Sequence, residues 1–124
     1  MQIITKCGIN MVSQNRSDYH VKHYITSQQH ILQSVENSLH QLNTETIDVF
    51  LIHRPDHLMD ASEVAEAFSK LKKDGKVLHF GVSNFLPSQF DLLSSFLDFP
   101  LVTNQISFSL LDLTPLENGT LDQC

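Results

Sequence analysis

Glycine and cysteine are scarce in this sequence of 124 residues, which contains four of the first and two of the second. No two glycines stand within two residues of each other, so the G-x-G-x-x-G turn of a Rossmann dehydrogenase cannot occur. The two cysteines, Cys7 and Cys124, lie near opposite ends of the chain, which indicates free thiols rather than a disulfide framework. Free thiols are typical of a reducing compartment, so we expect a cytoplasmic protein.

Basic residues are few as well. Eight lysines and arginines stand against 14 aspartates and glutamates, and the formal net charge is −6. Because binding to nucleic acid depends on lysine and arginine contacts with phosphates, we expect no nucleic-acid partner. The longest hydrophobic run, residues 47–52, is interrupted by Asp48 and is too short to span a bilayer. The N-terminus has no basic segment followed by an apolar stretch, so we expect no signal peptide and no membrane partner.

A metal site is not expected either. His20 and His23 lie in a polar stretch, residues 10–24, which we interpret as a long loop, and Asp18 is the nearest carboxylate. Zinc sites take three or four ligands from protein side chains, and this stretch supplies too few. A metal-dependent barrel hydrolase would need histidines at several strand ends, and only His53 ends a predicted strand.

Short apolar segments alternate with amphipathic ones along the whole chain. The expected strands cover residues 3–8, 47–53, 77–83 and 101–105, and the expected helices cover residues 26–43, 60–74 and 87–97. Thr26–Gln29 and Asp60–Glu63 have the spacing of capping boxes, Asn43 is a plausible C-terminal stop, and Pro87 suits the first position of a helix. Strands that alternate with helices are typical of an α/β fold with a parallel sheet.

Each expected strand ends in residues that can form hydrogen bonds or titrate. They are Lys6, His53, Ser83 with Asn84, and Asn104 with Gln105. Chemistry in parallel α/β folds takes place at the C-terminal ends of the strands. Because side chains alternate along a strand, Gln105 should share a face with Leu101, and Ser83 should share a face with Val77. One face should then bring Lys6, His53, Ser83 and Gln105 to one mouth. Each of them alone also fits a structural role, such as an exposed lysine or a turn residue.

Four segments resemble the aldo-keto reductase family. Residues 75–85, GKVLHFGVSNF, are similar to the family's G-K-(I/V)-x-x-(I/F)-G-V-S-N-F, and residues 47–55, IDVFLIHRP, resemble its D-L-x-L-I-H-x-P strand. Residues 4–6, ITK, resemble the strand of the active-site lysine, and residues 102–105, VTNQ, resemble the strand that follows. The resemblance implies a partial TIM (β/α)8 barrel, with strands three to six of eight and helices on the outer face.

The family resemblance also implies an activity and a role for each strand-end residue. The full-length parent would reduce a small carbonyl substrate, an aldehyde or ketone, to an alcohol with NADPH. Lys6 would lower the pKa of a proton-donating tyrosine, because a nearby cation favours the phenolate. His53 would orient the carbonyl, and the nicotinamide carboxamide would be held by Ser83, Asn84 and Gln105.

The sequence departs from the family at its ends. The family's tyrosine and its aspartate precede the lysine strand, whereas Tyr19 and Tyr24 follow it. A strand begins close to Met1, and a helix cap signal at Thr120–Gln123 stands directly before the end. We therefore expect residues 1–124 to form a partial aldo-keto reductase barrel domain, truncated at both ends and inactive in isolation. The alternative to an enzyme is a non-catalytic fragment, or a half barrel that needs a partner chain to supply the missing half.

Overall fold

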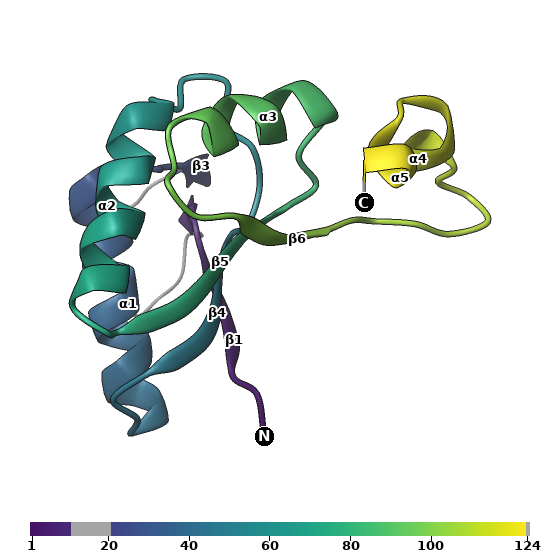
Figure 1. The fold of residues 1–124 in the computed structure, drawn as a ribbon. Coiled ribbons are helices and arrows are strands. Elements are labelled where there is room, and N and C mark those ends of the chain that lie inside the picture. The colour runs from purple at the N-terminus through teal and green to yellow at the C-terminus, as the bar shows by residue number, and fades with distance from the viewer. Residues whose placement is uncertain (11–20, 124) are drawn as a thin grey trace.

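The computed structural model describes residues 1–10 and 21–123 and has a parallel sheet as its centre (Figure 1). The strands are β1 (Ile4–Cys7), β4 (Ile47–Ile52), β5 (Val77–Ser83) and β6 (Leu101–Gln105), and they pair in the order β1-β4-β5-β6. The helices α1 (Gln28–Leu42), α2 (Ala61–Lys73) and α3 (Pro87–Ser95) connect them and cover one face. The predicted α/β fold, with about four parallel strands in sequence order and helices outside, is confirmed.

The start of α1 differs by one residue from the prediction. Ser27, not Thr26, is the N-cap, and its side chain accepts a hydrogen bond from the backbone N–H of His30 (3.3 Å). The Thr26 side chain is buried instead. The end of α1 is as predicted, because Asn43 takes the left-handed conformation (φ 49°) that commonly terminates helices.

Helix α2 is capped as predicted, but its first turn also serves its neighbour. Asp60 accepts hydrogen bonds from the backbone N–H groups of Ser62 (2.9 Å) and Glu63 (3.3 Å). The Glu63 carboxylate does not fold back on its own helix and instead accepts from the backbone N–H of Gln28 (3.0 Å). This contact satisfies an N–H group at the start of α1 that has no partner within the helix, and it ties α1 to α2.

The hydrophobic core lies between the sheet and the helices. Phe80 is fully buried there, with its ring stacked on Phe68 (centroids 4.3 Å apart) and tilted against Phe99 (5.5 Å). Val77 also belongs to this core, although alternation from Ser83 predicted it on the opposite face. None of the described helices is both long enough and apolar enough to cross a membrane.

A bulge in the pairing of β5 with β6 overturns one prediction about facing. Phe80 pairs with Leu101 and Val82 with Asn104, so two steps along β5 match three steps along β6. An extra residue reverses the alternation of side chains beyond it. Leu101 therefore packs in the helix-side core, and the prediction that it shares a face with Gln105 is wrong. The bulge separates the part of β6 that builds the core from the part that reaches the mouth.

The close approach of β6 depends on Gly81 in β5. A Cβ atom at this position would lie 2.6 Å from the Thr103 backbone oxygen and 2.8 Å from Cδ2 of Leu51. Such distances are shorter than van der Waals contact, and backbone cannot move away as a flexible side chain can. Glycine is therefore required where the helix-free face of the sheet is most crowded.

We expect Gly81→Ala to lower the free energy of unfolding by about 1–3 kcal/mol, the usual range for overpacking. Leu78→Ala in the same strand is the control, because its side chain is 45% exposed and should change stability by less than about 1 kcal/mol. Urea unfolding followed by circular dichroism measures both. Equal midpoints for the two variants would contradict the crowding argument.

Three of the four small elements had no clear sequence signal. The strands β2 (Ile9–Asn10) and β3 (His23–Tyr24) pair antiparallel at the base of the predicted long loop, whose residues 11–20 lie outside the described part. The helices α4 (Thr114–Glu117) and α5 (Thr120–Gln123) follow β6. The predicted cap at Thr120–Gln123 thus marks a real helix, while α4 was not predicted.

Candidate active site

The ends of the two outer strands meet across the helix-free face. β1 and β6 occupy opposite edges of the sheet, yet the Lys6 ammonium donates a hydrogen bond to the side-chain oxygen of Gln105. A flat sheet would hold these strands three spacings apart, roughly 14 Å, and side chains that stand perpendicular to the sheet would not bridge that distance. The sheet is therefore concave on this side, as half of a barrel must be.

Side chains on this concave face form rows across the strands. Lys6 pairs with Leu51, and Leu51 pairs with Gly81. His53 stands one row further toward the strand ends, and its backbone N–H continues the ladder by donating to Cys7 O (2.8 Å). Lys6 and His53 thus lie on the same face of the sheet, as the alternation of side chains predicted.

His53 lies in a positively charged environment. Partial burial lowers the pKa of its imidazole below the ordinary value, and the charges of Lys6, Arg54 and Lys22 lower it further. Both effects disfavour the imidazolium. The ring is consequently neutral at pH 7, with one nitrogen able to donate a hydrogen bond to a carbonyl oxygen and the other able to accept.

Ser83 and Asn84 form a network with the end of β6. The Ser83 hydroxyl donates to the backbone oxygen of Gln105 (2.9 Å) and accepts from the Asn84 amide (3.0 Å). Asn84 has a left-handed backbone (φ 55°), and its side-chain oxygen accepts from the backbone N–H of Ser107 (2.7 Å). Ser83 is buried, so in this structure it positions Asn84 and Gln105 rather than standing open at the surface.

Asn104, which the sequence placed at the same strand end, has a structural role. Its side-chain oxygen accepts from the backbone N–H of Phe85 (3.3 Å), and its amide donates to Phe85 O (2.9 Å). Both polar groups are therefore used to hold the turn after β5. Ordinary alternation explains this, since consecutive residues of a strand such as Asn104 and Gln105 point to opposite faces.

Other candidate groups are not brought to this mouth. Burial raises the pKa of the Cys7 thiol to about 12, which excludes a thiolate nucleophile at neutral pH. His23 contacts Asn10 (3.3 Å) and the backbone oxygen of Val21 (2.9 Å), and His20 and Tyr19 lie outside the described residues. No group of three or more possible metal ligands occurs within residues 1–10 and 21–123.

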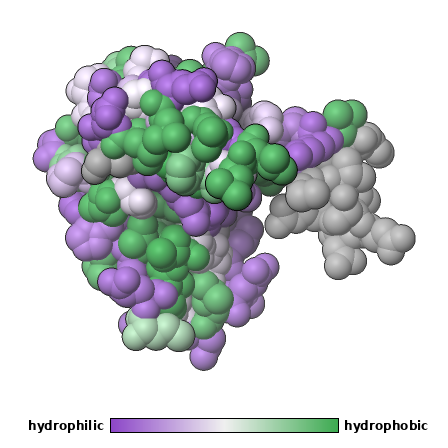
Figure 2. All heavy atoms as spheres, turned by 90° about the vertical axis from the view of Figure 1, so that its right-hand side faces the viewer, coloured by the Kyte–Doolittle hydropathy of each residue, from purple (hydrophilic) through white to green (hydrophobic). Residues whose placement is uncertain are grey.

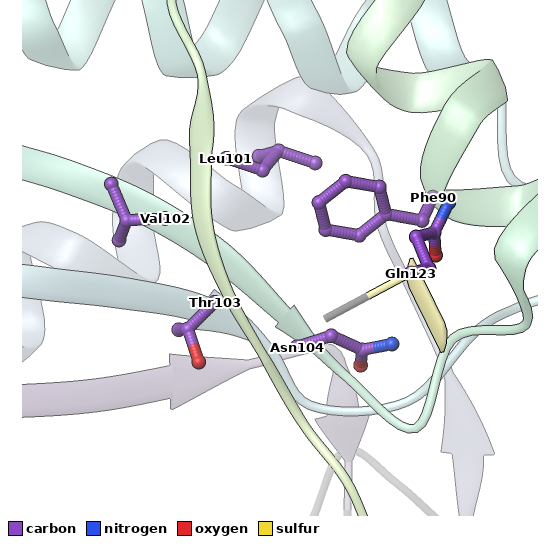
Figure 3. A pocket seen from close by; sticks show the side chains of 6 residues that line it. All are labelled: Phe90, Leu101, Val102, Thr103, Asn104 and Gln123. Carbon is purple, nitrogen blue, oxygen red and sulfur yellow. The ribbon is translucent and has the colours of Figure 1, made fainter. Parts of the chain in front are cut away.

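A cavity of about 270 Å³ lies elsewhere, beside β6 and between α3 and α5. Figure 3 shows Phe90, Leu101 and Gln123 among the residues that line it. The Gln123 amide donates to Asp91 (2.7 Å), which fixes α5 beside α3. Asn104 is the one predicted strand-end residue that lines this cavity, whereas Lys6, His53, Ser83, Asn84 and Gln105 do not, so the cavity is separate from the mouth.

The groups that remain available at the mouth fit a primary amide such as the nicotinamide carboxamide. Binding an amide requires both hydrogen-bond donors and acceptors. Asn84 bonds to Ser83 and to the Ser107 backbone and keeps a second N–H and a second lone pair, and Gln105 adds a further amide group. Gln105 is exposed at the strand end, and only its oxygen is engaged, by Lys6. The residues present therefore fit the carboxamide end of the cofactor that the sequence predicted.

Comparison with known proteins gives the family. The model of the Aldo/keto reductase family matches residues 1–122 of the chain. The chain belongs to the aldo-keto reductase family. It is 53% identical to the oxidoreductase YdhF of Escherichia coli over 123 residues, and 48% identical to the 6-dehydroglucose reductase of Agrobacterium fabrum over 121 residues. These matches cover 99% and 98% of this chain.

Solved aldo-keto reductase structures share the fold. The glycerol dehydrogenase of Gluconobacter oxydans superposes with a TM-score of 0.82 at 33% identity, over 94% of this chain and 35% of that one. The similar proteins of known structure are (β/α)8 barrels, so the four-stranded sheet of this chain is part of such a barrel. The chain spans 41% of the length of each of the two curated relatives named above.

Proposed function

We propose that residues 1–124 supply the carbonyl-orienting and nicotinamide-holding part of an NADPH-dependent carbonyl reductase. The observation that supports this proposal is the hydrogen bond of Lys6 with Gln105. It joins the two outer strands across the concave face, next to His53. Bound NADPH would supply the hydride that reduces an aldehyde or ketone to an alcohol. The protein itself would bind the cofactor, orient the carbonyl substrate and supply a proton.

Each strand-end residue then has a separate task. The neutral His53 ring donates a hydrogen bond to the carbonyl oxygen and sets its direction. The Lys6 ammonium stabilises the conjugate base of a neighbouring phenol and so favours proton release to the developing alkoxide. Asn84 and Gln105 hold the carboxamide, and Ser83 keeps both in place through its two hydrogen bonds.

The rest of the barrel is the partner that this proposal requires. The concave face carries hydrophobic residues that are open to solvent, including Ile4 with 56% of its surface exposed (Figure 2). Among the strands of residues 1–10 and 21–123, the outer strands β1 and β6 each have one edge without a neighbour in the sheet. Four further strands from the same or another chain would cover this face and close an eight-stranded barrel.

A graft tests the proposal on a complete barrel. Residues 1–124 replace the matching part of the 6-dehydroglucose reductase, whose substrate is given in its name, so the assay is defined. We expect this "grafted reductase" to oxidise NADPH with 6-dehydroglucose, because the graft restores every strand-end group to a closed barrel. The parent enzyme is the positive control. A folded grafted reductase without any carbonyl reduction would overturn the proposal.

A further inference from the structure

The chain turns back on itself soon after β6 (Figure 1). Ser109 and Asp112 exchange two backbone hydrogen bonds, each 3.1 Å long, which close this turn. Leu110 and Leu111 at its tip are almost fully exposed. Hydrophobic burial therefore does not hold the tip, and polar contacts at the base of the turn decide where it lies.

Asp112 stands at this base and shares a small cavity with Asn84 and Ser107. The cavity has a volume of about 180 Å³, and Thr114 and Asn118 also line it. Hydrogen bonds from the side chains of Thr114 and Ser107 lower the pKa of the Asp112 carboxyl. The group is therefore an ionised acceptor at neutral pH, and it holds the Ser107 side chain beside Asn84.

Ser107 in turn fixes which way the Asn84 amide faces. Its backbone N–H donates to the Asn84 side-chain oxygen (2.7 Å), and a backbone N–H can only donate, so the oxygen must lie on that side. The Asn84 NH2 group then faces the Ser83 hydroxyl (3.0 Å). Ser83 alone would not settle the orientation, because a hydroxyl can either donate or accept.

A reversed Asn84 amide would not pair with a carboxamide. The carboxamide of nicotinamide has an oxygen on one side and an NH2 group on the other, and each needs the opposite kind of group across from it. Reversal of Asn84 would place oxygen against oxygen or NH2 against NH2, and the hydrogen bonds would be lost. The grip on the carboxamide thus depends on a backbone N–H that lies 23 residues further along the chain.

We propose that Asp112 is a positioning residue, which holds the Asn84 amide through Ser107 in the one orientation that pairs with the nicotinamide carboxamide. This inference rests on the proposed function, since it concerns how the same cofactor is held. Asp112 itself need not touch the cofactor, because its effect passes through two successive hydrogen bonds.

Two ligands separate a loss at the nicotinamide end from a general loss of structure in the grafted reductase. NADPH contains the carboxamide, whereas adenosine 2′,5′-bisphosphate contains only the adenosine end of the cofactor. We expect Asp112→Ala to raise the Kd of NADPH about three- to tenfold, the contribution of one hydrogen bond between neutral groups. The Kd of adenosine 2′,5′-bisphosphate should be unchanged. Isothermal titration calorimetry measures both.

Ser107→Ala removes the other partner of the same bond. It should raise the Kd of NADPH as much as Asp112→Ala does, and the double variant should bind no more weakly than either, because all three lack the same link. Asp112→Asn keeps an oxygen that can accept from Ser107 and should retain most of the affinity. Glu117→Ala is the matched control, because Glu117 is an exposed carboxylate on α4 that does not line the cavity. Equal losses for the two ligands in Asp112→Ala, no loss for either, or additive losses in the double variant would overturn the proposal.

A readout without any cofactor keeps this inference separate from the proposed function. In the unliganded grafted reductase, NMR relaxation of the Asn84 side-chain amide should give an order parameter of about 0.85, as for rigid backbone, and one below about 0.6 in Asp112→Ala. Glu117→Ala should keep the higher value. If the grafted reductase reduces no carbonyl at all, the proposed function fails, but the order parameters still decide whether Asp112 fixes Asn84; equal values in all variants mean that it does not.

Discussion

The isolated chain is expected to oxidise no NADPH above background with a reactive aldehyde. Hydride transfer leaves an alkoxide that must be protonated, and a positioned general acid contributes about 10²–10⁴-fold to such a step. Among residues 1–10 and 21–123 the structure brings Lys6 and His53 to the mouth but no tyrosine: Tyr24 lies on β3, and the family places its tyrosine before the lysine strand. Lys6 cannot take the place of the tyrosine, because the role proposed for its charge is to stabilise the conjugate base of the proton donor and not to supply the proton.

Cofactor binding by the isolated chain should fail for a separate reason. Asn84 and Gln105 hold one end of the nicotinamide, and no described residue of this chain is assigned to the phosphates or the adenosine. Losses that act on the same transition state through different groups should multiply. The assay compares the chain alone with the chain mixed with the remaining segments of a family member. Turnover by the chain alone that is lost in His53→Ala would contradict the expectation.

Substitution of Lys6 or His53 in the grafted reductase should strongly lower its rate of carbonyl reduction. We expect Lys6→Met to lower kcat about 10²–10⁴-fold with little change in KM, because its charge acts on proton transfer and not on substrate binding. Without the nearby cation the phenol pKa rises, so the pH optimum should also move upward. A structural role alone would leave the pH profile where it was.

His53→Gln should lower kcat/KM about 10²-fold, since the carbonyl loses its orienting hydrogen bond and misplacement by about 1 Å has an effect of that size. Lys73→Met and Asn104→Ser serve as controls. The first removes an exposed lysine far from the mouth, and the second alters a strand-end amide that only holds the Phe85 turn. An Asn104 variant as inactive as the His53 variant would show that the assay reports stability and not chemistry.

Periodicity and strand-end chemistry were sufficient to predict the sheet and the gathering of Lys6, His53 and Gln105. The strands β4 and β5 are largely apolar and are followed or ended by polar residues. These features depend on neighbouring residues only, so the sequence shows them directly. The roles of the same residues rested on the family resemblance, since a lysine or histidine at a strand end has no fixed chemistry of its own.

Features that depend on tertiary contacts were not predicted. The sequence LVTNQ does not predict a bulge, because the extra residue of β6 is defined only by its pairing with β5. The choice of Ser27 over Thr26 as the cap reflects the burial of the Thr26 side chain. Glu63 has the sequence position of a capping-box residue, yet its partner is Gln28 on another helix, 35 residues away.

In the proposed site the ends of β5 and β6 hold the nicotinamide while His53 faces the substrate carbonyl. A crystal structure of the grafted reductase with NADP⁺ tests this most directly. We predict the carboxamide within hydrogen-bond distance of the Asn84 and Gln105 side chains, with Lys6 and His53 around the reactive ring carbon. A nicotinamide bound away from the ends of β5 and β6, or a His53 ring turned from it under the helices, would contradict the account.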